Sequence, residues 1–82
     1  MEFLIYILYS KKFDKTYVGF TSSLIERFYS HNFYAKKGFT TKFRPWEVLH
    51  IEVFETKSEA MAKEKWFKSG IGREAIKKMI SD

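Results

Sequence analysis

The 82-residue sequence contains no cysteine, a single proline and only four glycines. The absence of cysteine excludes a disulfide framework and a thiolate metal site, and it fits a reducing compartment, so we expect a cytoplasmic protein. No apolar run approaches the roughly 20 residues of a membrane-spanning helix, so no membrane association is expected. Glu2 stands where a signal peptide would carry a basic flank, which argues against secretion. Without a linker or a repeat, residues 1–82 are predicted to form a single domain.

Aromatic and basic side chains dominate what the sequence does contain. Nine Phe, five Tyr and two Trp supply a large buried area per residue for so short a chain. The net charge of +5 comes entirely from residues 1–45, which carry eight Lys and Arg against three acids, whereas residues 46–82 carry seven of each sign. Such an asymmetry is typical of a protein that binds a nucleic acid, although a basic balance can also serve solubility alone.

Three segments have the patterns of β-strands. Residues 3–9 form a continuous aromatic and aliphatic run, which predicts a central strand covered on both faces. A polar turn separates it from residues 16–20, which predict a second, antiparallel strand. Apolar and polar residues alternate over 46–54, so we expect a third strand with Leu49, Ile51 and Val53 toward the core.

Two capping boxes mark the starts of helices. Ser23 with Glu26 predicts a helix over residues 23–32, and Thr56 with Glu59 predicts one that ends near residue 69, before Gly70. A short helix over 72–80 closes the chain. The expected fold class is α/β (α+β), with a small three-stranded antiparallel sheet flanked by three helices.

The stretch between the first helix and the third strand has no clear period. Residues 33–45 predict a long functional loop, with aromatic residues set among four cations and no acids. Its cations are Lys36, Lys37, Lys42 and Arg44.

Glu64 is the most unusual position in the predicted helices. Three of its neighbours at three and four residues are apolar, so its carboxylate projects from the core-facing side of its helix. A carboxylate in that position has to be paired or to bind a metal ion. Both a metal site and an ion pair with Lys68 fit the pattern.

Four further side chains suit phosphate chemistry. Arg27 and His31 are one helical turn apart, where they could grip a phosphate and carry a proton, or simply form a solvated flank. Tyr6 and Tyr17 lie on paired strands and could be plain core residues. A phenol, with a pKa of about 10, accepts a proton from water only where cations lower that value. His50 is interpreted as structural.

These residues carry a resemblance to a known family. The order Tyr6, Tyr17-Val18-Gly19, Arg27 and Glu64 resembles the GIY-YIG nuclease superfamily. Nearly the whole chain is similar to its small stand-alone bacterial members, through the strings YILYS, KTYVGFTSSLIERFYSHN, RPWEVLHIEVFETKSEA and KEKWFKSG. Two features depart from the family pattern: Leu4 replaces the glycine of the first motif, and no Asn follows Glu64.

The resemblance implies a GIY-YIG fold and a single-metal endonuclease site. Catalytic roles would fall to Tyr6, Tyr17, Arg27, His31 and Glu64, with one Mg²⁺ or Mn²⁺ held by Glu64. Arg27 would neutralise transition-state charge, and one tyrosine would help to activate water. The substrate would be DNA, with RNA left open, in repair or recombination. Lys36, Lys37, Lys42 and Arg44 would grip its backbone, and Phe39 or Phe43 would stack on unpaired bases.

Two other functions remain open at this point. The chain could be a nucleic-acid-binding module with little catalytic activity, or a domain that docks a protein partner through its aromatic loop.

Overall fold

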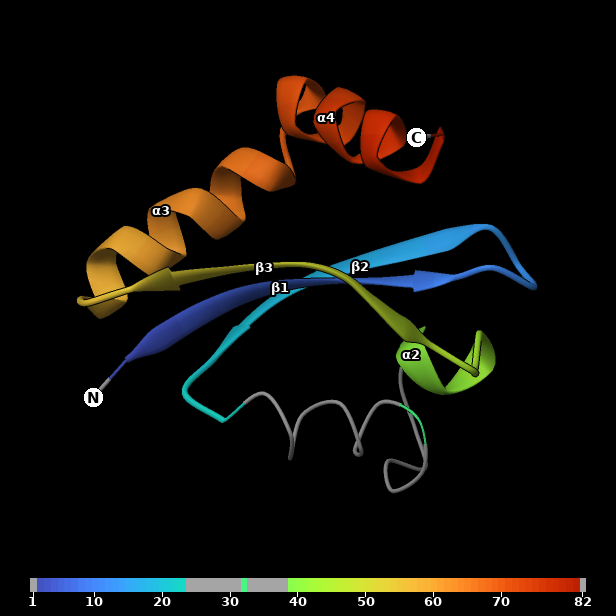
Figure 1. The fold of residues 1–82 in the computed structure, drawn as a ribbon, viewed down its shortest axis with the longest axis horizontal. Helices are drawn as coiled ribbons and strands as arrows, with labels where there is room; N and C mark the ends of the chain where they lie inside the picture. The colour runs from blue at the N-terminus through green and yellow to red at the C-terminus, as the bar shows by residue number, and fades with distance from the viewer. Residues whose placement is uncertain (1, 24–31, 33–38, 82) are drawn as a thin grey trace.

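The computed structural model describes residues 2–23, 32 and 39–81. Within them the elements are β1 (Phe3–Ser10), β2 (Lys15–Thr21), α2 (Phe39–Lys42), β3 (Glu47–Phe54), α3 (Lys57–Phe67) and α4 (Gly70–Ser81). The strands form one antiparallel sheet in the order β2-β1-β3, and α3 and α4 lie over one face of it while α2 lies on the other side (Figure 1). The predicted α+β class is confirmed. Among the described residues every helix is too short or too polar to cross a membrane.

β1 is the central strand, as its continuous apolar run predicts. Ile5 and Ile7 point toward α3 and α4, where they pack with Phe67 and Ile76 in the first core cluster. The alternate residues Tyr6 and Leu8 point to the opposite face and pack with Trp46 in a second cluster. Both faces of β1 are therefore buried, and each fully buried Ile or Leu contributes about 1.5–3 kcal/mol to folding.

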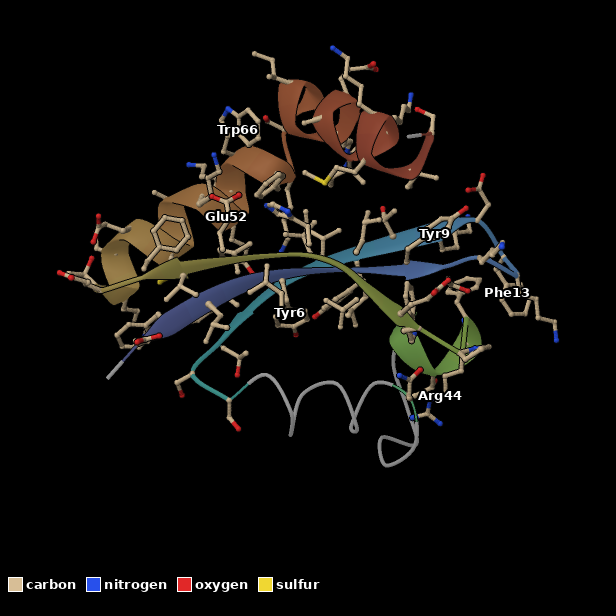
Figure 2. All side chains as sticks on the ribbon, in the orientation of Figure 1. Tyr6, Tyr9, Phe13, Arg44, Glu52 and Trp66 are labelled. Atoms are coloured by element: carbon tan, nitrogen blue, oxygen red, sulfur yellow. The ribbon has the colours of Figure 1, made fainter. Side chains whose placement is uncertain are left out.

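The predicted facing of β3 is right for Leu49 and wrong for Ile51 and Val53. Ile7 pairs with His50, so His50 and Glu52 lie on the face covered by the helices. Ile51 and Val53 lie on the Tyr6 face instead and are 41% and 56% exposed. Figure 2 shows Glu52 on the α3 side of the sheet and Tyr6 on the other.

A β-bulge separates the facing of Leu49 from that of Ile51 and Val53. The pairing with β1 runs from His50 directly to Val48, which leaves Leu49 as an extra residue that packs against the core on the helix side. The polar side chains on that face are satisfied locally: the His50 ring nitrogen lies 2.9 Å from Glu52, and Lys63 lies 4.0 Å from the same carboxylate. His50 also packs edge-on against Phe67, in agreement with its structural interpretation.

The second capping box forms as predicted. Thr56 has extended backbone angles, its hydroxyl accepts from the Glu59 N–H at 3.2 Å, and it donates to the Glu59 carboxylate at 2.8 Å. α3 ends at Phe67, slightly before the predicted end.

Gly70 does not end α3, contrary to prediction, but begins α4. The Ser69 hydroxyl accepts from the Gly72 N–H at 3.4 Å, so Ser69 caps α4. The helix therefore begins at Gly70, two residues before its predicted start. Gly72 is needed for close packing: a Cβ there would lie 2.7 Å from the carbonyl carbon of Phe67. The two helices are thus joined by two residues, and this tight junction faces β2.

The segment between β2 and β3 differs from the loop that was predicted. Residues 39–42 form the one-turn helix α2. The helix predicted over 23–32 falls mainly on residues 24–31, outside the described part of the chain.

Candidate active site

Tyr6 and Tyr17 lie side by side on one face of the sheet. Tyr6 pairs with Gly19 and Tyr17 with Leu8, so both phenols project away from α3 and α4. Their ring centroids are 6.2 Å apart, with the ring planes tilted by 35°. Tyr6 is 2% exposed, whereas Tyr17, on the edge strand, is only partly buried. The predicted antiparallel pairing of these two strands is confirmed, and it brings the two phenols together.

Gly19 makes this arrangement possible. A Cβ at Gly19 would overlap the Tyr6 hydroxyl oxygen, would lie 2.5 Å from its Cζ and would lie 3.0 Å from Cε1 of Tyr17. The Tyr6 ring therefore rests directly on the backbone of β2, and any side chain at this position would displace it.

A buried Asn–Trp contact supports the pair from outside the predicted site. Trp46 packs edge-on against Tyr17, with ring centroids 6.4 Å apart. The Asn32 amide nitrogen donates to the Trp46 carbonyl at 3.0 Å, and the Trp46 N–H donates to the Asn32 carbonyl oxygen. The Asn32 side chain thus makes the two hydrogen bonds that a neighbouring strand would make, and it holds the backbone of Trp46 in place. Sequence reasoning assigned neither residue; the available signal was a polar amide at the end of an amphipathic helix.

Glu64 lies on α3 between two buried positions, Ala60 and Phe67. Its side chain is 23% exposed, and Lys68, one turn later, places its ammonium 3.7 Å from the carboxylate. The core-facing placement predicted from the sequence is therefore present, and so is the predicted ion pair. Because the carboxylate is partly open to solvent and its cation is itself more than half exposed, the pair can open.

The possible metal ligands at Glu64 suit one weakly bound hard cation. The described residues contain no group of three His, Asp or Glu side chains close enough to hold a metal. A divalent ion at Glu64 would therefore have one carboxylate ligand and otherwise water and substrate oxygens, which is the usual environment of Mg²⁺.

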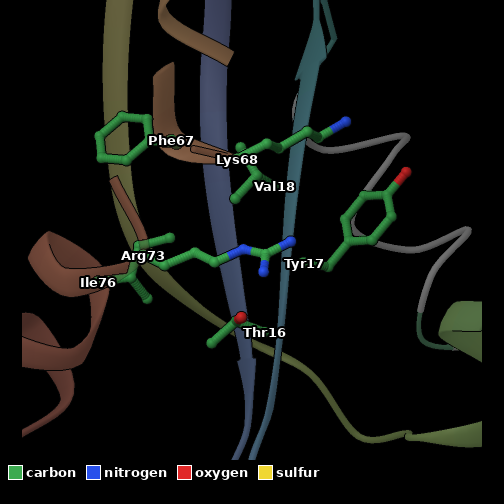
Figure 3. A pocket seen from close by; sticks show the side chains of 7 residues that line it. All are labelled: Thr16, Tyr17, Val18, Phe67, Lys68, Arg73 and Ile76. Carbon is green, nitrogen blue, oxygen red and sulfur yellow. The ribbon is translucent and has the colours of Figure 1, made fainter. Parts of the chain in front are cut away.

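A cavity of about 290 Å³ connects α3 to the tyrosine edge of the sheet. Its lining includes Tyr17 from β2 and Lys68 from the junction of the two helices (Figure 3). Lys68 is thus shared: it pairs with Glu64 and it lines the same cavity as Tyr17. The C-terminal end of α3 therefore lies near Tyr17 on the edge strand, although the phenols project from the opposite face of the sheet.

The other predicted site residues lie elsewhere or outside the described part of the chain. Arg27, His31, Lys36 and Lys37 are outside it. Lys42 is exposed in the last turn of α2, and Arg44 lies next to that helix (Figure 2).

Phe43 packs against the tip of the β1–β2 hairpin. It packs edge-on against Phe13, with centroids 5.6 Å apart, and Lys15 lies 5.6 Å from its ring centroid. This packing gives Phe43 a structural role next to Lys42 and Arg44, where the sequence suggested stacking on bases.

The fold and the site together define a class of protein. It is a small α+β domain in which two strand tyrosines pack over a glycine on one face of the sheet, while the helix that carries Glu64 covers the other face. Residues 2–75 match the GIY-YIG catalytic domain, and the chain belongs to that family. The GIY-YIG family is of nuclease type, which implies a nucleic-acid substrate, and the resemblance read from the sequence is confirmed.

Relatives and a solved structure agree with this assignment. A UPF0213 protein of Limosilactobacillus reuteri is 31% identical over 81 residues, covering 96% of this chain and 83% of the relative. A UPF0213 protein of Listeria monocytogenes serotype 4b is 40% identical over 68 residues, covering 82% and 74%. The solution NMR structure of the UPF0213 protein BH0048 from Bacillus halodurans is similar with a TM-score of 0.57 and 25% identity, covering 96% of this chain and 85% of that one.

Proposed function

We propose that the protein is a metal-dependent endonuclease that hydrolyses phosphodiester bonds in DNA. The observation that supports this most strongly is the Tyr6–Tyr17 pair packed over Gly19 in a chain of the GIY-YIG family. Glu64, whose partner Lys68 lines the same cavity as Tyr17, would supply the acid that such chemistry needs. Branched or nicked DNA handled in repair or recombination is the substrate class we favour.

The metal would be one Mg²⁺ or Mn²⁺ held by Glu64. When bound, such an ion supplies Lewis-acid stabilisation of the phosphate charge and of the leaving oxygen. Lys68 would have to release the carboxylate, which its exposure permits.

The chain's own residues would carry the rest of the reaction. Hydrolysis adds water across one P–O bond, so a group is needed to take the proton of the attacking water. One of the two phenols, together with His31, would take that proton. Arg27 would hold the phosphate through two hydrogen bonds and neutralise its growing charge. Trp46 would keep the Tyr17 ring in place.

Cleavage of supercoiled plasmid and of a branched DNA, with and without Mg²⁺, tests this proposal. Glu64→Gln removes the acid and keeps its shape, and Arg27→Ala removes the phosphate ligand. Glu74→Gln is the matched control, because Glu74 lies on α4 with a side chain 71% exposed. We expect Mg²⁺-dependent cleavage that Glu74→Gln retains and that Glu64→Gln and Arg27→Ala lose by at least about 100-fold. Cleavage that survives both site changes would refute the proposal.

A second function is favoured by one specific observation. No Asn follows Glu64, and Lys68 already occupies its carboxylate, so the chain could bind nucleic acid with little turnover. That function predicts salt-dependent DNA binding without products at any Mg²⁺ concentration.

A further inference from the structure

A second cavity adjoins the one beside Tyr17. It has a volume of about 350 Å³ and lies between α4 and the start of β2. The two cavities share three lining residues: Thr16, Arg73 and Ile76. They therefore form one continuous groove along the free edge of the sheet, which we call the β2 groove.

The α4 side of the β2 groove is amphipathic. Arg73, Ile76, Lys77 and Ile80 line it, at a spacing that places all four on one face of the helix. The Arg73 side chain extends from α4 toward β2, and its guanidinium lies between Tyr17 and Thr16 in the view of Figure 3.

The charges in the β2 groove are mostly positive. Lys68, Arg73 and Lys77 line it, against the single acid Asp14. Asp14 already accepts a hydrogen bond from the Tyr9 hydroxyl at 2.9 Å. Arg73 forms no ion pair with any described residue, so its guanidinium fork is available to a ligand.

This concentration of charge arises on folding. Residues 46–82 are neutral overall. Lys68 and Lys77 form ion pairs with Glu64 and Glu74, at 3.7 and 3.5 Å, whereas Arg73 forms no ion pair with a described residue. Glu52 lies on the far strand with His50 and Lys63, while Arg73 and Lys77 face the hairpin. The charge count along the sequence therefore does not show that Arg73 and two lysines line a groove next to Tyr17 in the folded chain.

We propose that the β2 groove binds the sugar–phosphate backbone of the nucleic acid on one side of the cleaved bond, with Arg73 as a phosphate ligand. This inference rests on the proposed function. Guanidinium matches phosphate with two parallel hydrogen bonds, and Lys68 and Lys77 extend the positive track on either side. The remaining lining is aliphatic or buried, apart from Thr16 and Tyr17, so the contact is to the backbone and is independent of sequence.

Binding of a fluorescein-labelled DNA in EDTA, followed by anisotropy across a NaCl series, tests this inference without cleavage. We compare Arg73→Ala and Lys77→Ala with Lys78→Ala, which removes one charge from the same helix outside the groove lining. We expect Arg73→Ala to weaken binding about 5- to 20-fold at low salt and to reduce the slope of log K against log[salt] by about one. Lys77→Ala should act in the same direction, and Lys78→Ala should change binding less than about two-fold.

Equal losses in Arg73→Ala and Lys78→Ala would overturn the inference, because charge alone would then explain binding. So would displacement of the DNA by polyglutamate as readily as by unlabelled DNA, since the groove would then not recognise phosphate. The results of this binding assay can be distinguished from those of the cleavage assay. Metal-dependent cleavage with no specific role for Arg73 would refute only the groove, and groove-dependent binding without cleavage would refute only the nuclease.

Discussion

The ring of Tyr6 lies on the backbone of Gly19, the residue directly opposite it on β2. Tyr6 is fully packed, so its ring has no space to move aside if a side chain is introduced there. The glycine is thus required by close approach, and it couples the packing of the hairpin to the position of a candidate catalytic phenol.

Gly19→Ala should displace the Tyr6 ring. We expect a loss of about 1–3 kcal/mol in the free energy of unfolding, because overpacking at a buried site forces strain. Cleavage should fall with it. Gly70→Ala is the control, since a Cβ there would meet nothing within 4 Å. Urea denaturation and the ring proton shifts of Tyr6 measure both effects, and equal stability of the two variants would show that Tyr6 does not depend on Gly19.

Asn32→Ala should destabilise the domain through Trp46. The change leaves a buried N–H and a buried carbonyl without their partner, at a cost of about 1–3 kcal/mol for each group. Asn32→Asp keeps one acceptor and should lose less. The urea midpoint and the Trp46 fluorescence spectrum report on this contact. An unchanged midpoint in Asn32→Ala would show that the Asn32–Trp46 hydrogen bonds contribute nothing to stability.

Lys68→Gln should strengthen metal binding at Glu64. The ammonium at 3.7 Å competes with an incoming cation, so its removal should raise Mn²⁺ affinity several-fold. Lys65→Gln, an exposed change in the last turn of the same helix, should have a much smaller effect. The free-ion EPR signal of Mn²⁺ measures the affinity. Weaker binding in Lys68→Gln would contradict the idea that Lys68 occupies the metal position.

The Tyr9–Asp14 contact at the hairpin turn should be visible at high pH. The hydrogen bond that Tyr9 donates to Asp14 raises the pKa of Tyr9 above its usual value of 10.0, with smaller effects from burial and from the charges of Asp14 and Glu47. The neutral phenol is thus favoured in the folded state, so this stabilisation is complete below pH 10.0 and disappears as the pH rises through the raised pKa.

Tyr9→Phe removes that pH dependence. Ultraviolet titration of tyrosine ionisation should lose one component that titrates above the usual value in this variant, whereas Asp14→Asn should shift that component to lower pH. A Tyr9 component that stays at the same pH in Asp14→Asn would mean that Tyr9 and Asp14 do not interact in solution.

Much of the fold was predictable because local patterns determine it. The aromatic run of β1, the alternation in β2 and the Thr56 capping box each specify an element without reference to the rest of the chain. The paired phenols follow from the same alternation, once the hairpin is recognised.

The misassigned features depend on contacts distant in sequence. The bulge at Leu49 interrupts the alternation in β3, so Leu49 lies on the helix side while Ile51 and Val53 lie on the other, and the apolar pattern of the sequence alone does not reveal the break. Gly70 resembles a helix terminus until Ser69 is seen to cap α4. The β2 groove is unpredictable for a similar reason, because Arg73 and Lys77 become a basic track only when α4 is placed over β2.

Paramagnetic line broadening by Mn²⁺ in a ¹H–¹⁵N and aromatic NMR titration tests most directly whether Tyr6, Tyr17 and Glu64 form one metal site. We expect broadening that is strongest at Glu64, that reaches the ring signals of both tyrosines, and that spares Ser81 at the end of α4. Glu64→Gln should abolish it. Broadening centred on Glu59 or Glu74, with both tyrosine rings unaffected, would show that the phenols and the metal do not share a site and would contradict the nuclease proposal.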